Sequence, residues 1–128
     1  MTIVATTGIG AARQLVMDAL ATIGGLTVYA TMPDVPMAGA AWPVWAECAY
    51  GLGKLTRPLI HAYEVRVILP QGWTPETVDV ADGLVEQLAA ALSRLGPLEW
   101  VRPVQITFSN NASNAMPGLN ARVTVVQR

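Results

Sequence analysis

Two side chains in this sequence could perform nucleophilic chemistry as a pair: the single cysteine, Cys48, and the single histidine, His61. An imidazole beside a thiol can take its proton and leave a nucleophilic thiolate. Both residues fall on the core-facing positions of predicted strands, which is typical of packing residues. The three serines, Ser93, Ser109 and Ser113, lie outside any Gly-x-Ser-x-Gly turn. We therefore expect that the chain is not an enzyme and has no catalytic residues.

The sequence also predicts no metal site and no cofactor. One histidine and one cysteine cannot complete the usual ligand set of zinc. The carboxylates of Asp79, Asp82 and Glu86 share one helical face without an imidazole nearby in sequence, so we interpret this face as solvated. In "TTGIGAARQL", Arg13 stands where a dinucleotide-binding loop has its third glycine. That segment is interpreted as the entry to a helix.

Hydrophobic periodicity predicts two helices. Apolar residues recur at helical spacing over residues 11–23, and Gly24 and Gly25 follow as a stop signal. A second helix is predicted to begin at Pro75, because Thr74 is a good N-cap, and to end at Gly96. Its expected apolar face consists of Ala81, Leu84, Val85, Leu88, Leu92 and Leu95.

Alternating apolar and polar residues predict strands over residues 26–32, 43–50, 59–69, 101–109 and 119–125. The segments Pro33 to Trp42 and Asn110 to Leu119 are predicted to be loops. The resulting order is α-β-β-β-α-β-β, with no linker that would separate two domains. It predicts one α+β domain over residues 1–128: a two-layer sandwich with a mainly antiparallel four- to five-stranded sheet and two helices on one face.

The composition indicates a subunit of an assembly. Hydrophobic residues make up 52% of the chain and charged residues 13%, against about 25% charged residues in an ordinary soluble domain. So few charges cover a surface poorly, so we expect apolar area to contact other protein. The formal net charge of −1, without a basic run, argues against direct DNA recognition. The sequence contains no apolar run of about 20 residues, so no membrane span is predicted.

Several residues are candidates for an interface. Trp42 and Trp45 flank Pro43 at the end of the first predicted loop, and for both an interface role and a core role remain open. The other candidates come from the two predicted loops: Met37, Asn111, Asn114 and Met116.

The order of elements resembles the tail terminator, or tail completion, proteins of long-tailed bacteriophages, especially those of actinobacterial phages. The likeness spans nearly the whole chain and is carried by "ARQLVMDALATIGGLTVYATMP", "LIHAYEVRVILPQG", "TPETVDVADGLVEQLAAALSRLG" and a closing pair of strands. Members of that family form a hexameric ring on the tail tube, stop its polymerisation and offer the opposite face to the head connector.

The resemblance implies a structural virion protein assembled in the host cytoplasm. Its implied partners are copies of itself, the tail tube protein and the head–tail connector protein, and DNA would pass through the pore without sequence-specific binding. Two alternatives stay open. Another connector, neck or tail tube subunit would be equally apolar, and a small-molecule-binding α+β dimer would need a concave apolar pocket.

Overall fold

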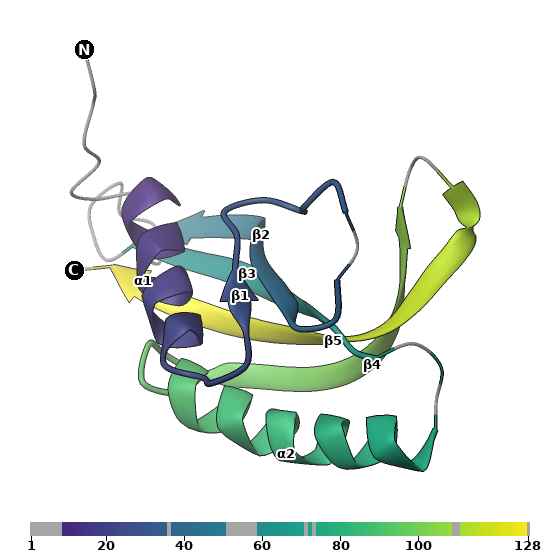
Figure 1. The fold of residues 1–128 in the computed structure, drawn as a ribbon. Helices are drawn as coiled ribbons and strands as arrows, with labels where there is room; N and C mark the ends of the chain where they lie inside the picture. The colour runs from purple at the N-terminus through teal and green to yellow at the C-terminus, as the bar shows by residue number, and fades with distance from the viewer. Residues whose placement is uncertain are drawn as a thin grey trace.

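The computed structural model describes residues 9–35, 37–50, 59–70, 72, 74–108 and 111–127. These residues form helices α1 (Ile9–Ala21) and α2 (Pro75–Leu92) and strands β1 (Thr27–Val28), β2 (Ala40–Tyr50), β3 (Leu59–Ile68), β4 (Leu98–Phe108) and β5 (Asn111–Gln127). The strands make one sheet in the order β1-β2-β3-β5-β4, and the helices pack on one of its faces (Figure 1). The predicted α+β fold and its element order are confirmed.

Both helices arise from the signals that predicted them. At the start of α2, the Thr77 N–H donates to Thr74 Oγ1 at 3.3 Å, and Pro75 occupies the first turn, where it needs no N–H partner. Helix α1 begins and ends two residues earlier than predicted. Its residues Ala12, Val16 and Leu20 are fully buried against the sheet and α2.

The first strand is shorter than predicted, and its pairing corrects the expectation of antiparallel neighbours. Only Thr27 and Val28 form β1, and they pair in parallel with Ala40 and Ala41 of β2. The reason is the connection between the strands: residues 29–39 carry the chain back before β2 begins, so β2 runs in the same direction as β1. The three other neighbouring pairs, β2–β3, β3–β5 and β5–β4, are antiparallel.

Strand β2 begins three residues earlier than predicted, and its side chains divide between the two sheet faces. Ala41 joins the core beneath the helices, whereas Trp42 and Val44 pack on the opposite face. A register shift between Trp45 and Glu47 then changes the alternation. The alternation of residues along β2 does not reveal from sequence which positions turn toward the helices and which turn away.

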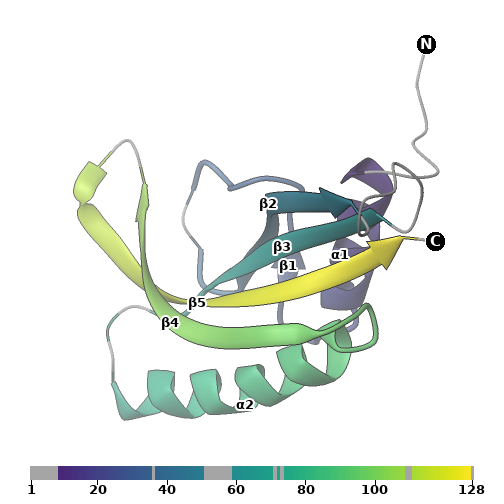
Figure 2. The same ribbon diagram turned by 180° about the vertical axis from the view of Figure 1, so that it is seen from behind.

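Most of the second predicted loop is also strand. Strand β5 begins at Asn111, and Met116 lies opposite Ile106 of β4 in a long hairpin. Its glycine is required for packing: a Cβ atom on Gly118 would lie 2.6 Å from the Val67 carbonyl oxygen. A glycine that permits close approach inside a sheet resembles a turn signal in sequence. In Figures 1 and 2 the hairpin curves strongly and extends beyond α2.

This curvature creates a second hydrophobic cluster on the face away from the helices. Its buried members are Ala40, Trp42, Ile68 and Ile106, with Tyr29, Val44, Val104 and Met116 packed around them. Strands β2 and β4 are separated in the sheet by β3 and β5, so Trp42 and Ile106 can share a cluster only because the sheet curls.

Pro43 lies on β2 at a position whose backbone turns away from β3, where any other residue would offer an N–H donor. The Tyr29 N–H donates to the Ala41 carbonyl at 2.8 Å, so Ala41 turns its backbone groups away from β3. Backbone direction alternates along a strand, so Pro43 turns outward too. It has no N–H to pair with an added strand.

The opposite edge of the sheet, strand β4, has the same device. The Leu69 N–H donates to the Pro117 carbonyl, which turns odd-numbered residues of β5 toward β3 and even-numbered residues toward β4. Arg102, opposite Asn120, therefore turns its backbone toward β5, and Pro103 turns outward. The part of β2 that extends beyond the short terminal strand β1 and the terminal strand β4 thus each carry a proline at an outward-facing position.

Candidate functional site

The sheet face opposite the helices, here called the open face, carries most of the polar side chains that interact across strands. We define it by Glu47, Glu64, Arg66, Glu99, Trp100, Arg102, Asn120 and Arg122, which come from β2, β3, β4 and β5. The second hydrophobic cluster adjoins these residues at the curved end of the sheet. Figure 2 shows the sheet from behind, with α1 on its far side.

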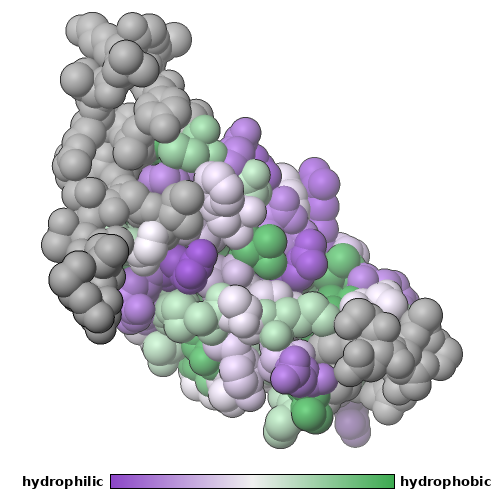
Figure 3. Space-filling model, turned by 90° about the horizontal axis from the view of Figure 1, so that it is seen from above, coloured by the Kyte–Doolittle hydropathy of each residue, from purple (hydrophilic) through white to green (hydrophobic). Residues whose placement is uncertain are grey.

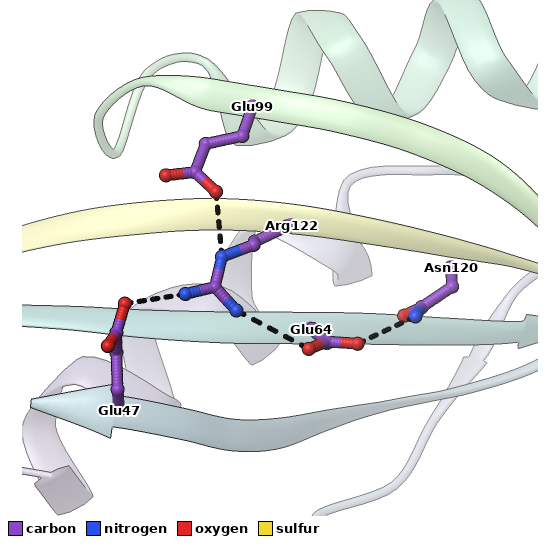
Figure 4. Close-up of polar contacts among 5 residues, drawn as sticks. All are labelled: Glu47, Glu64, Glu99, Asn120 and Arg122. Carbon is purple, nitrogen blue, oxygen red and sulfur yellow. Dashed lines mark hydrogen bonds and ion pairs between the residues drawn. The ribbon is translucent and has the colours of Figure 1, made fainter.

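Arg122 is the centre of an ion-pair network on the open face (Figure 4). Its Nη2 lies 2.6 Å from Glu47 Oε1, its Nε lies 2.7 Å from Glu99 Oε2, and its Nη1 lies 3.4 Å from Glu64 Oε2. Asn120 Nδ2 donates to the second oxygen of Glu64 at 2.7 Å. One guanidinium therefore links β2, β3 and β4 to β5.

The network is partly shielded from water. The Arg122 side chain is 19% exposed and that of Glu64 25%, whereas Glu47 and Glu99 reach further into solvent. Three carboxylates around one guanidinium leave two negative charges in excess. Removing Arg122 would therefore leave like charges close together on adjacent strands.

A second row of polar residues crosses the open face next to this network. Arg66, Asn120 and Arg102 lie opposite one another on β3, β5 and β4; we call them the arginine row. Among the described residues, Arg66 and Arg102 have no carboxylate within ion-pair distance. The Arg102 guanidinium lies over the Trp100 ring, 4.1 Å from its centroid, which is a cation–π contact.

Two buried polar atoms of the arginine row have no hydrogen-bond partner among the described residues: Arg66 Nε and Asn120 Oδ1. Asn120 is only 9% exposed. A buried donor or acceptor that stays unpaired costs about 1–3 kcal/mol, and native structures contain few of them.

On the helix side of the sheet, Tyr63 is fully buried and bonded to Arg13 of α1. Burial raises the pKa of Tyr63 above its ordinary value, because the phenolate would lose hydration; the Arg13 charge and hydrogen bond act in the opposite direction. The hydroxyl and the guanidinium together fix α1 to the centre of β3.

The raised pKa of Tyr63 predicts a loss of stability in alkali. Because the unfolded chain releases this proton near pH 10 and the folded chain at higher pH, the free energy of unfolding should fall as pH rises above about 10. The variant Tyr63→Phe should lack this component, and at neutral pH should lose about 0.5–1.5 kcal/mol with the hydrogen bond. Denaturant titrations across this pH range measure both effects. Tyr29→Phe is the matched control; the prediction fails if both variants show the same alkaline behaviour.

The catalytic candidates weighed in the sequence are cross-strand neighbours: Cys48 of β2 lies opposite His61 of β3. His61 is 1% exposed and Cys48 is half-buried. The core position expected for His61 is confirmed. An imidazole so deeply buried is typical of a packing residue rather than of a base open to a substrate. The absence of catalysis stays a prediction.

The sequence-predicted interface residues fall into three groups. Trp45 and Met37 are exposed, at 44% and 58%. Trp42 is buried and Met116 half-buried, both in the second hydrophobic cluster. Asn111 and Asn114 lie in β5, but their side chains lie outside the described part of the chain. On the face seen from above (Figure 3), hydrophobic side chains are interspersed with hydrophilic ones.

The ion-pair network was not predicted from the sequence. The signal available was the alternation of Glu64 and Arg66 with apolar residues on β3, and of Asn120 and Arg122 on β5. That pattern indicates polar faces on both strands. It does not indicate that the polar faces of β3 and β5 lie next to each other on one side of the sheet, because the local pattern does not determine strand order.

An apolar depression with a volume of about 290 Å³ lies between the turn after α1, the end of β3 and α2. Gly25, Gly39, Leu69, Val80 and Leu84 are among the residues that line it. Among the described residues, no three His, Cys, Asp or Glu side chains gather closely enough to hold a metal ion. The helices described here are also too short or too polar to cross a membrane.

No protein-family model matches this sequence, and no curated protein shows significant similarity to it.

Proposed function

We propose that this chain is the subunit of a hexameric ring that caps the tail tube of a long-tailed bacteriophage, ends tube polymerisation and joins the tail to the head connector. The proposal extends the resemblance in element order to a function. It assigns the chain to the virion and gives it three kinds of protein partner: copies of itself, the tube protein and the connector protein.

The observation that carries the proposal is the open face. One face of the sheet is packed by two helices, while the other presents a polar surface with buried atoms that lack partners. A ring subunit needs at least two different contact surfaces, because each copy meets two neighbours through different sides. Exposed apolar side chains at Val35, Met37 and Trp45 add further contact area away from the helices' buried faces.

The edge prolines bear on how such subunits would join. Strand addition is disfavoured at Pro43, just beyond the part of β2 that β1 covers, and at Pro103 in β4, so contacts through side chains and loops are favoured over edge pairing. The loop before β2, which carries Met37, is one such element.

The test is tail assembly with this protein withheld. We expect tubes of irregular, excessive length that do not join heads, and recovery of uniform length when the purified chain is added back. Electron microscopy of the tails measures both. Tubes of normal, uniform length that are still joined to heads would contradict the proposed role.

The apolar depression beside α2 favours one alternative, a small-molecule-binding protein. Its volume of about 290 Å³ is at the lower end of the range of about 300–1,000 Å³ for ligand sites. Mass measurement separates the two functions. A stable dimer whose mass is unchanged by tube protein would favour the alternative.

A further inference from the structure

We propose that the open face is the docking surface for helix α2 of a second copy of this chain, so that copies associate head to tail. This contact deepens the proposed ring function and rests on it for its biological purpose, but it is argued from the surface chemistry of the described residues. The docking element is the outer face of α2, which we define by Glu76, Val78, Asp79, Val80, Asp82, Gly83 and Glu86.

Charge complementarity is the first argument. The outer face of α2 carries four exposed carboxylates, from Glu76, Asp79, Asp82 and Glu86, within eleven residues. Four of the chain's nine acidic residues thus lie on one side of one helix. The arginine row offers two guanidinium groups without a carboxylate partner among the described residues. Opposed patches of this kind direct association and fix its register.

The spacing of the two charge patterns also agrees. Arg66 and Arg102 are separated by two strand intervals, about 9.6 Å between their backbones. Asp79 and Glu86 are seven residues apart, which is about 10.5 Å along a helix. Asp79 and Glu86 can therefore each pair with one of the two arginines at the same time, if α2 lies along the arginine row and crosses the strands of its neighbour. The network around Arg122 carries excess negative charge, so it repels the carboxylates of α2. This repulsion opposes a shift of α2 from the arginine row toward Arg122.

Gly83 is a further argument. It lies in the middle of α2, where glycine lowers helix stability by about 1 kcal/mol relative to alanine. A Cβ atom on Gly83 would meet nothing within 4 Å, so the chain's own packing does not require glycine there. A neighbour that approaches the helix backbone closely would require it. Val78 and Val80, at 44% and 47% exposure, flank this outer face of α2 on its two opposite sides.

The contact joins two different surfaces, so it is heterologous. Such a contact repeats from copy to copy and closes into a ring when the rotation between copies divides a full turn. Each open face would receive a helix from the neighbour, and each sheet would then be covered on both sides.

The test is charge reversal followed by restoration. The purified wild-type chain, studied by native mass spectrometry and light scattering at high protein concentration and low salt, should associate beyond a dimer, and added salt should weaken the association. The variant Arg66→Glu/Arg102→Glu should weaken association by about tenfold or more, and so should Asp79→Arg/Glu86→Arg. Combining all four substitutions should restore it, because the charges are then exchanged. Circular dichroism checks that each variant is folded.

Two reversals outside the proposed contact are the controls: Arg94→Glu, in the turn after α2, and Asp18→Lys, on α1. Both residues are exposed, and both variants should associate like the wild-type chain. The proposal is overturned by a chain that stays monomeric at its highest soluble concentration, by controls that disrupt association equally, or by the absence of restoration in the four-substitution variant.

Failure of this contact is distinguishable from failure of the tail function. If Arg66→Glu/Arg102→Glu restores uniform tail lengths as well as the wild-type chain does, the docking contact is wrong and the terminator function stands. If the charge-exchange results hold while tails need no such protein, the contact stands and the terminator function is wrong.

Discussion

Replacing Trp42 by alanine is expected to lower the free energy of unfolding by about 3–5 kcal/mol. Trp42 is 1% exposed and is the largest member of the second hydrophobic cluster. Its removal would leave a cavity between β2 and the curved end of the β4–β5 hairpin, and rigid strands on both sides limit how far that cavity can collapse. Urea denaturation followed by circular dichroism, which does not depend on the lost indole, measures the change.

Trp45→Ala is the matched control, because Trp45 lies three residues away in the same strand and differs mainly in burial. At 44% exposure, its truncation should change stability by about 0.5–1 kcal/mol. The two tryptophans were not separable from the sequence, and this pair of variants separates them. If both variants lowered the free energy of unfolding by the same amount, the predicted special role of Trp42 in the second cluster would be wrong.

Replacing Arg122 by leucine is expected to destabilise the chain by about 2–3 kcal/mol at neutral pH, less than for a fully buried pair because the network is partly exposed. Leucine retains part of the packing volume but leaves Glu47, Glu64 and Glu99 without their shared cation. Denaturant titrations of the variant and the wild-type chain at neutral pH measure the loss.

A double-mutant cycle isolates the ionic part of this effect. In the background Glu47→Gln/Glu64→Gln/Glu99→Gln, the carboxylates are neutral but keep their shape. Arg122→Leu should then cost clearly less than in the wild-type chain. An equal loss in both backgrounds would mean that Arg122 contributes through packing alone.

The element order was predictable because each helix and most strands carry their own local signals. Helix α2 has a cap, a proline in its first turn and an apolar stripe, all within its own residues. Strand β3 alternates cleanly: its apolar residues Tyr63, Val65 and Val67 are fully buried, and Glu64 and Arg66 between them are not.

The errors come from features that depend on distant residues. Thr27 and Val28 pair in parallel because of where β2 lies, which the alternation of residues 26–32 does not encode. The polar segment after residue 110 forms a strand because β4 supplies its partners. The faces of β2 depend on a register shift at Trp45 and on the curl of the sheet.

The candidate site was predictable only in part for the same reason. Exposure of Met37 and Trp45 agrees with an interface role without establishing it. The arginine row and the network around Arg122 exist only after β5 inserts between β3 and β4. Local periodicity cannot reveal that insertion, because it is a property of the whole topology.

Pro43 and Pro103 set a limit on uncontrolled growth. Six copies held close together would place many sheet margins at high local concentration, a condition under which other sheet proteins convert to fibres. Pro103 in the middle of β4, and Pro43 where β2 extends beyond β1, each interrupt a ladder of hydrogen bonds that could run from one molecule to the next. An assembly that this chain forms through its faces and loops can therefore stop at a fixed number of copies.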